Sequence, residues 1–179
     1  MAVNKISEIK NAIGQGVRPN LFRVSFASPA WSDTENALSF LVKAAALPGS
    51  TLGIVDVPHM SGRRYKVGGD RTFADWTTTV LTDPAYNVRK SLEEYQSRFV
   101  NTDFETGAVN SGAGNRGEVD LTTITVEQFN ADGGVQTTYK LENAWISEIG
   151  ATTLSYDSTD VIEEFSVTWV YDYHTIVRS

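Results

Sequence analysis

The chain contains no cysteine among its 179 residues, which excludes disulfide bridges, thiolate metal sites and cysteine nucleophiles. Histidine is almost as scarce, since the chain contains only two, His59 and His174. Neither histidine has a second ligand at a spacing that would hold a metal ion, such as H-x-x-x-H. We therefore expect no metal site, and nothing in the sequence indicates a cofactor.

Long hydrophobic runs are also missing. No stretch approaches the roughly 18 apolar residues of a membrane-spanning helix, so we expect no membrane anchor. The N-terminal MAVNKISEIKNAIGQG lacks the continuous apolar run of a secretory signal peptide. The length of 179 residues suits one domain, residues 1–179, which can bury a core without a covalent staple.

Basic residues are few, and they are unevenly placed. Residues 1–98 hold 12 Lys and Arg against 9 Asp and Glu, a balance of +3. Residues 99–179 hold 3 against 13, a balance of −10, and the whole chain carries −7. A protein that binds nucleic acid needs many Lys or Arg side chains facing the phosphates, so the charge of this chain does not indicate DNA binding. The acidic half serves either solubility or a specific role.

Alternation of apolar and polar residues predicts a chain made mostly of strands. The residues ADGG after position 129 predict a hairpin, and Asp157-Ser158 a turn. A short amphipathic helix is predicted over residues 3–13. The predicted strands cover residues 22–26, 37–49, 71–81, 121–129, 135–143, 145–154 and 163–176. The last of these places Phe165, Val167, Trp169, Tyr171 and Tyr173 on one face.

One longer helix is predicted over residues 84–99. Asp83 is a good N-cap, and Pro84 fits the first helical position. The apolar stripe on this helix consists of Ala85, Val88, Leu92, Tyr95 and Phe99.

Residues 51–66 predict an extended arm, in which two short β-prone runs, 54–57 and 64–67, flank a turn region at Pro58 and Gly62. Residues 101–118, rich in Gly and Asn, predict a flexible surface loop. The fold class is therefore mainly β: an antiparallel β-sandwich or partly closed barrel with one flanking helix and an extended hairpin arm.

The element Gly68-Gly69-Asp70-Arg71 is the one stretch that invites a chemical interpretation. It is not a phosphate-binding loop, because its spacing differs from G-x-x-x-x-G-K-[ST] and no helix follows it. The glycines are instead predicted to supply positive φ for a turn into a strand. Trp76 is predicted to be a packing residue.

The chain has many carboxylates, but the sequence does not identify any two of them as a catalytic pair. Glu163 and Glu164 are adjacent in a predicted strand and would point to opposite faces. Asp70 and Asp75 are better explained by a salt bridge with Arg71 or by a turn. The sequence therefore predicts no enzyme.

Three stretches resemble the tail tube protein of contractile-tailed bacteriophages: RPNLFRV, KAAALPGSTLGIVDVPHMSGRRYKVGGDRTFADWTTTVLTDPAYNVRKSLEEYQ and VIEEFSVTWVYDY. The most specific pieces are Lys43–Pro48, the arm ending at Arg64, and GGDRTFADWTTTV continuing into TDPAYNVRKSLEEYQ. They occur in the family's order. The loop 101–118 and the hairpin after it are not diagnostic.

The resemblance implies a structural virion protein. Hexameric rings would stack head to tail into the hollow inner tube of a contractile tail, which conducts DNA across the host envelope. The implied partners are other copies of the chain, the tail sheath, baseplate and tail terminator proteins, a tape-measure protein in the lumen, and passing DNA that is not specifically bound. The implied location is the virion tail, assembled in the host bacterial cytoplasm.

Two sets of residues are candidates for roles in such a tube. The arm is the candidate contact with the neighbouring ring, and deletion of residues 54–63 is expected to leave folded protein that no longer polymerises. An acidic lumen would avoid gripping DNA. The inter-ring candidates are Ile54, Val55, Val57, Pro58, His59, Met60, Arg63 and Arg64, and the lumen candidates are Glu118, Asp120, Glu127 and Glu142.

Other functions remain open at this point. Tube proteins of phage-like bacteriocins and of type VI secretion are similar in fold, so such a device is the main alternative. A carbohydrate-binding β-sandwich would use its four tryptophans as a sugar platform, although their alternation with polar residues favours the core. A hydrolase on a β-scaffold is the third candidate.

Overall fold

The structure of the chain is a computed structural model that describes residues 6, 14, 16–27, 38–39, 41–60, 62–99 and 121–177. The predicted loop 101–118 lies outside the described residues, as does the predicted helix 3–13 apart from residue 6. In chain order the elements are β1 (Phe22–Ala27), β2 (Val42–Ala45), β3 (Ser50–Pro58), β4 (Arg64–Phe73), β5 (Trp76–Leu81), α3 (Asn87–Arg98), β6 (Thr122–Phe129), β7 (Val135–Ile149), β8 (Glu164–Val170) and β9 (Tyr173–Val177).

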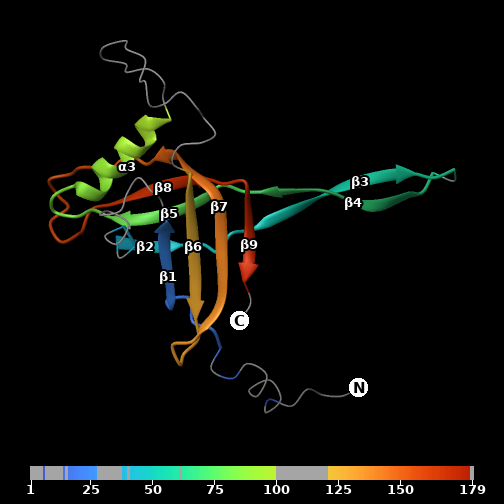
Figure 1. The fold of residues 1–179 in the computed structure, drawn as a ribbon, viewed down its shortest axis with the longest axis horizontal. Coiled ribbons are helices and arrows are strands. Elements are labelled where there is room, and N and C mark those ends of the chain that lie inside the picture. The colour runs from blue at the N-terminus through green and yellow to red at the C-terminus, as the bar shows by residue number, and fades with distance from the viewer. Residues whose placement is uncertain are drawn as a thin grey trace, which may run out of the picture.

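The strands form two packed sheets that share β7. Sheet A contains β1, β6, the first part of β7 and β9, and sheet B contains the end of β7, β8, β5 and β2. Figure 1 shows the strands of one sheet running across those of the other, which is an orthogonal packing. All these pairings are antiparallel, and in the described part of the chain the sheets do not close into a barrel. The predicted antiparallel sandwich with a flanking helix is confirmed.

Strand β7 passes from sheet A to sheet B through a bend at Asn143. The backbone there has φ of 58°, in the left-handed region. The Asn143 side-chain amide donates a 2.8 Å hydrogen bond to Asp172, whose backbone N–H donates to the Glu142 carbonyl at 3.2 Å. Asp172 lies between β8 and β9, so both strand segments change sheet at the same corner.

This corner corrects two predicted strand boundaries. Residues 135–143 and 145–154 were predicted to be separate strands, but one strand covers Val135–Ile149 because the bend is absorbed by a single residue. The predicted strand 163–176 is instead divided into β8 and β9. Tyr173, predicted to share the core face, is exposed.

Replacing Asn143 should separate backbone strain from side-chain bonding. We expect Asn143→Ala to lower the free energy of unfolding by about 2 kcal/mol. Alanine is strained in the left-handed backbone conformation of this position, and it loses the hydrogen bond to Asp172. Asn143→Gly loses the same bond without the left-handed penalty, so it should be clearly less destabilising. Chemical denaturation of both variants measures the difference, and equal losses would contradict the strain argument.

The core lies between the sheets and under the helix. Buried side chains from β1, β5, β6, β7, β8 and α3 make one apolar cluster. Two predicted strands are shorter than expected around it. Of the predicted strand 37–49, residues 42–45 form β2, while Leu38 and Leu41 are helical. The predicted strand 71–81 is interrupted at residues 74–75, where the chain passes from the arm into sheet B.

Helix α3 begins three residues later than predicted. Tyr86 has φ of 58°, which interrupts the helical path between Pro84 and Asn87. The N-cap residue is Tyr86, not Asp83 as predicted, but the Asp83 carboxylate still accepts hydrogen bonds from the first backbone N–H groups of the helix, those of Asn87 and Val88, at 3.0 and 3.1 Å. A turn in which the Tyr86 N–H donates to the Asp83 carbonyl brings the carboxylate within reach.

The apolar stripe of α3 packs on β7. Val88, Leu92 and Tyr95 are buried as predicted, and the Tyr95 hydroxyl donates to the Ala144 carbonyl at 3.3 Å. Ala85 lies in the turn before the helix and is exposed. The helix therefore covers the sandwich and leaves the arm free.

Candidate assembly surfaces

The arm is a two-stranded sheet made of β3 and β4, which pair from Ser50↔Phe73 to Pro58↔Arg64. It is longer than the predicted span of 51–66, because the pairing continues to the surface of the sandwich. Figure 1 shows it projecting far from the body, and beyond Phe73 at its base it packs little against other described elements. The arm is thus a separate structural feature, held together mainly by the backbone pairing between β3 and β4.

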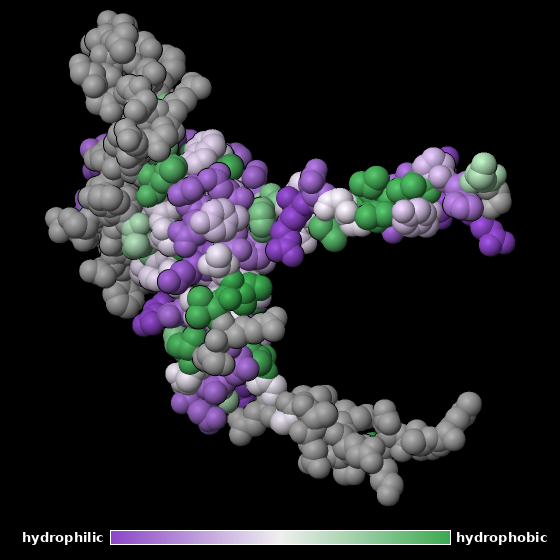
Figure 2. Space-filling view, turned by 45° about the vertical axis from the view of Figure 1, so that its right-hand side comes forward, coloured by the Kyte–Doolittle hydropathy of each residue, from purple (hydrophilic) through white to green (hydrophobic). Residues whose placement is uncertain are grey.

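The side chains of the arm are unusually apolar for a surface. Figure 2 shows hydrophobic residues gathered along its length. The large exposed apolar residues of the arm are Leu52, Ile54, Val55, Met60, Tyr65 and Val67. An isolated two-stranded hairpin is at best marginally stable in water, and a long exposed apolar edge promotes pairing with other chains. Both facts indicate that a partner covers this surface.

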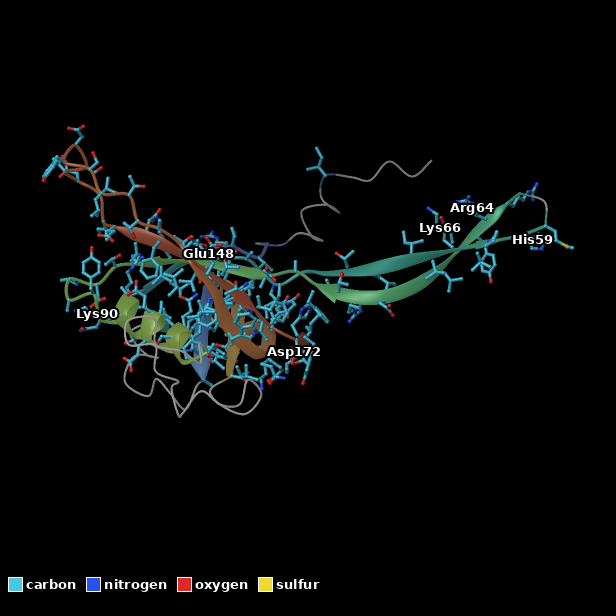
Figure 3. The ribbon with its side chains drawn as sticks, turned by 90° about the horizontal axis from the view of Figure 1, so that it is seen from above. His59, Arg64, Lys66, Lys90, Glu148 and Asp172 are labelled. Atoms are coloured by element: carbon cyan, nitrogen blue, oxygen red, sulfur yellow. The ribbon has the colours of Figure 1, made fainter. Side chains whose placement is uncertain are left out.

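The tip of the arm is a tight turn. The His59 N–H donates to the Arg63 carbonyl at 2.8 Å, and Gly62 has φ of 72°. Met60 is fully exposed. The structure brings all eight inter-ring candidates together in the outer part of the arm, where Figure 3 shows His59 and Arg64 near the far end. Leu52, Tyr65 and Val67 share this surface but were missed, although alternation along 64–73 could have indicated them.

The Gly-Gly-Asp element is not a turn, which corrects the sequence interpretation. Gly68, Gly69 and Asp70 lie inside β4, and neither glycine is among the residues with positive φ. The register shifts here, since Leu52 pairs with Arg71 whereas Ile54 pairs with Gly68. Strand β4 therefore carries one extra residue, a β-bulge that bends and twists the arm.

The glycines are required by the close approach of two backbones. A Cβ on Gly69 would lie 3.2 Å from the Gly53 carbonyl carbon and 3.3 Å from a Val55 methyl group. A Cβ on Gly53 would lie 3.2 Å from the Asp70 carbonyl oxygen. Asp70 and Arg71 are exposed strand residues beside this contact, and Trp76 is buried at the start of β5.

A bulky residue at Gly69 should disturb the arm and spare the body. We expect Gly69→Val to leave the melting temperature within about 3 °C of the parent, because the arm lies outside the core. Self-association of the variant should be weaker, because the bulge can no longer close. Thermal melts and sedimentation velocity measure the two effects, and the Gly49→Val variant controls for a general glycine effect, since a Cβ at Gly49 meets nothing within 4 Å. Loss of the fold would contradict the bulge interpretation.

The base of the arm is anchored by aromatic rings. Phe73, the last residue of β4, packs edge-on to His174 with ring centroids 5.0 Å apart, and lies 6.0 Å from the ring of Tyr171. Burial lowers the pKa of His174, and the charge of Arg71 lowers it further, so the neutral form of the ring is favoured. Burial likewise raises the pKa of Tyr171. The arm is therefore joined to a rigid part of the sandwich.

A second surface is the face of sheet A that points away from the core. Glu127 and Glu142 lie on this face, on β6 and β7. Arg23 of β1 forms a 2.6 Å ion pair with Glu127, and Lys140 lies on the same face. The four charges balance. The other two lumen candidates, residues 118 and 120, lie outside the described residues.

A third surface is the connection between β7 and β8, residues 150–163. It surrounds a hollow of about 380 Å³, which we call the loop hollow, lined by residues 151–155, 158 and 161–164. Large apolar side chains are exposed around it, namely Leu154, Tyr156, Val161 and Ile162. Sequence reasoning treated this stretch as a strand end and a turn, and so missed the surface.

The described residues do not form a constellation suited to catalysis or sugar stacking. Glu163 accepts a hydrogen bond from the Tyr86 hydroxyl, and Glu164 forms an ion pair with Lys43. Trp76 and Trp169 are buried, and Trp145 is partly buried, so these three rings make no exposed platform; Trp31 lies outside the described residues. The part of the chain that the structure describes also contains no group of potential metal ligands, and no helix there could cross a membrane.

Much of the exposed apolar surface of the described residues lies on a projecting hairpin and around the loop hollow, which is typical of a structural protein that associates with other chains. The comparisons agree with this class. Residues 17–177 match the sequence model of the phage tail tube protein family. The chain belongs to this family, and is a structural component of the phage tail.

The curated relatives support the assignment along most of the chain. The tail tube protein gp19 of Enterobacteria phage T4 is 32% identical over 161 residues, which cover 89% of this chain and 91% of that protein. Its counterpart from Enterobacteria phage T6 is 31% identical over the same coverage. The resemblance to tail tube proteins of contractile-tailed bacteriophages is confirmed, and this is a structural family, not a family of enzymes.

The fold is also found in a solved contractile assembly. A chain of the sheath–tube complex of an extracellular contractile injection system, PVC, in the extended state matches with a TM-score of 0.66. The match covers 99% of this chain and 100% of that chain at 13% identity. At that identity the likeness concerns the fold alone.

Proposed function

We propose that copies of this chain form hexameric rings that stack head to tail into the inner tube of a contractile tail, a conduit for DNA across the host envelope. The observation that carries this proposal is the projecting arm with its exposed apolar residues and free strand edges, in a member of the tail tube family. Head-to-tail stacking is a heterologous contact that does not close, so it produces a filament.

Rings would form by joining the edges of sheet A. Its strand order is β1, β6, β7 and β9, so β1 and β9 are the two edges. Pairing β1 of one copy with β9 of the next would satisfy both edges, which otherwise promote uncontrolled association. The arm would then reach the neighbouring ring through Ile54, Val55, Val57, Pro58, His59, Met60, Arg63 and Arg64.

The proposed partners follow from this position in the tail. They are the sheath outside the tube, the baseplate and terminator proteins at its ends, and a tape-measure protein and DNA inside it. Assembly would take place in the host bacterial cytoplasm and end in the virion. A bacteriocin or type VI-like device is the alternative, and identifying the particle that contains this chain distinguishes the two.

Electron microscopy of the purified chain at rising concentration tests the proposal. We expect annular particles with six-fold symmetry and hollow rods built from them. A chain that stays monomeric at high concentration, in the presence and absence of its sheath protein, would overturn it.

We further propose that the outer face of sheet A lines the lumen. There Glu127 and Glu142 would offset Arg23 and Lys140, so that the face has no net charge to hold phosphate. We expect rods of the Glu127→Gln/Glu142→Gln variant to retain duplex DNA at low salt and release it as salt is raised, whereas parent rods retain none. Co-sedimentation of rods with labelled duplex measures this.

The matched control removes the same number of acids elsewhere. Glu93→Gln/Glu94→Gln changes the exposed face of helix α3 by the same charge, and its rods should retain no DNA. Retention by both double variants would show that total charge decides the effect, and the lumen assignment would fail.

A further inference from the structure

Two of the exposed apolar surfaces that the described residues form, the arm and the loop hollow, lie at opposite ends. The arm projects from one end of the long axis, and the loop between β7 and β8 projects from the other, as both Figure 1 and Figure 3 show. Heterologous stacking needs two different and complementary surfaces on each copy, placed so that one copy can reach the next. The arm and the loop hollow have this placement.

The two surfaces also carry opposite charge. The outer arm, residues 54–68, holds Arg63, Arg64 and Lys66 against Asp56, a balance of +2. Residues 151–164 contain four acidic residues and no Lys or Arg, a balance of −4 that the ion pair of Lys43 with Glu164 reduces to −3. Opposite potentials on facing surfaces fix register and suppress wrong contacts.

The shapes are compatible as well. The arm tip presents Met60, a flexible side chain suited to irregular gaps, beyond every contact with its own chain. The loop hollow offers about 380 Å³ of space, beside Val161 and Ile162, which are 77% and 67% exposed. The tip, with Met60 and its basic neighbours, is thus complementary to a hollow of mixed polar and apolar lining with acidic neighbours.

We infer that the arm tip of one copy docks into the loop hollow of a copy in the next ring. This inference rests on the proposed tube and specifies its receiving surface. Met60 enters the hollow against Val161 and Ile162. Arg63 and Arg64 lie against the acidic rim at Asp157 and Asp160, two exposed carboxylates.

Engineered cysteines give a direct test, because the chain has none of its own. Rods of the Met60→Cys/Val161→Cys variant, oxidised after assembly, should give a ladder of covalent oligomers on a non-reducing gel. The Met60→Cys/Asp132→Cys variant is the control, since residue 132 is exposed on the β6–β7 turn, and it should give no ladder. Parent-like rods of the first variant without a ladder would overturn the inference.

Charge reversal gives a second, independent test. Arg63→Glu/Arg64→Glu and Asp157→Lys/Asp160→Lys should each raise the concentration needed for rod formation by about tenfold or more, because like charges then face each other. The two pairs combined should restore assembly towards the parent concentration. Additive weakening in the combined variant would overturn the inference.

The outcomes also separate this inference from the proposed function. If the arm variants block assembly while the loop variants assemble normally, the arm docks elsewhere, and the tube proposal stands. If the parent chain forms no rods at all, the tube proposal itself fails.

Discussion

Shortening the arm should abolish rod formation and leave the sandwich intact. Leu52 pairs directly with Arg71, so replacing residues 53–70 with Asn-Gly creates a two-residue hairpin at that position. The arm supplies no residue to the buried cluster, so the melting temperature should change by no more than about 3 °C. This replacement is cleaner than deleting residues 54–63, which would leave the β4 half of the arm unpaired. Electron microscopy and thermal melts measure the two outcomes.

Point variants identify which part of the arm is responsible. Val55 and Val67 are directly opposed on the two strands and exposed, so Val55→Ser/Val67→Ser should raise the concentration needed for assembly by about tenfold. Thr51 and Thr72 form an equivalent opposed pair, and Thr51→Ser/Thr72→Ser should assemble like the parent. Normal rods from the shortened chain would show that the arm is dispensable.

Removing the ring of Trp169 should cost more stability than other single changes outside the arm. Trp169 is fully buried in β8, between Trp76 of β5 and Ile146 of β7 in the register of sheet B. Its ring lies 5.3 Å from that of Phe26 in sheet A, so it joins the two sheets. We expect Trp169→Ala to lower the free energy of unfolding by about 3–5 kcal/mol, since a large cavity remains.

Two further variants test the cavity explanation. Trp169→Phe keeps most of the ring but loses the indole N–H, which donates to the Thr78 hydroxyl at 3.3 Å, so about 1–2 kcal/mol should be lost. Tyr156→Ala removes a fully exposed ring, and its effect should stay within about 0.5 kcal/mol. Urea denaturation measures all three. A Trp169→Ala loss no larger than that of Tyr156→Ala would contradict its central place in the core.

Local patterns were sufficient to predict most elements. Alternation identified the strands of both sheets, and the stripe of Val88, Leu92 and Tyr95 identified the buried face of α3. The place of Asp83 beside the start of the helix was also found, although the N-cap residue itself was not, because the left-handed conformation of Tyr86 leaves no mark in residue type. The lack of cysteine and of clustered histidine led to the prediction that the chain has no metal site and no cysteine nucleophile.

The assembly surfaces were predicted unevenly. The arm was recognised because β-prone residues flank a turn, without the periodicity of a buried element. The loop hollow was missed, because its lining depends on how residues 151–164 fold back on themselves beside sheet B. The balance of charge on sheet A was missed too, since Arg23 and Glu127 are 104 residues apart and meet only through the pairing of β1 with β6.

The sequence by itself determined that this is a β-rich structural protein of the tail tube family with a projecting arm, because alternation, composition and motif order are properties of neighbouring residues. Only the tertiary structure decided that Gly69 and Asp70 form a bulge, that β7 crosses both sheets at Asn143, and that a hollow with acidic neighbours lies opposite a basic arm. Each of these depends on which distant strand pairs with which, and in what register. Register is set by the packing of the whole chain, so it cannot be read from any one segment.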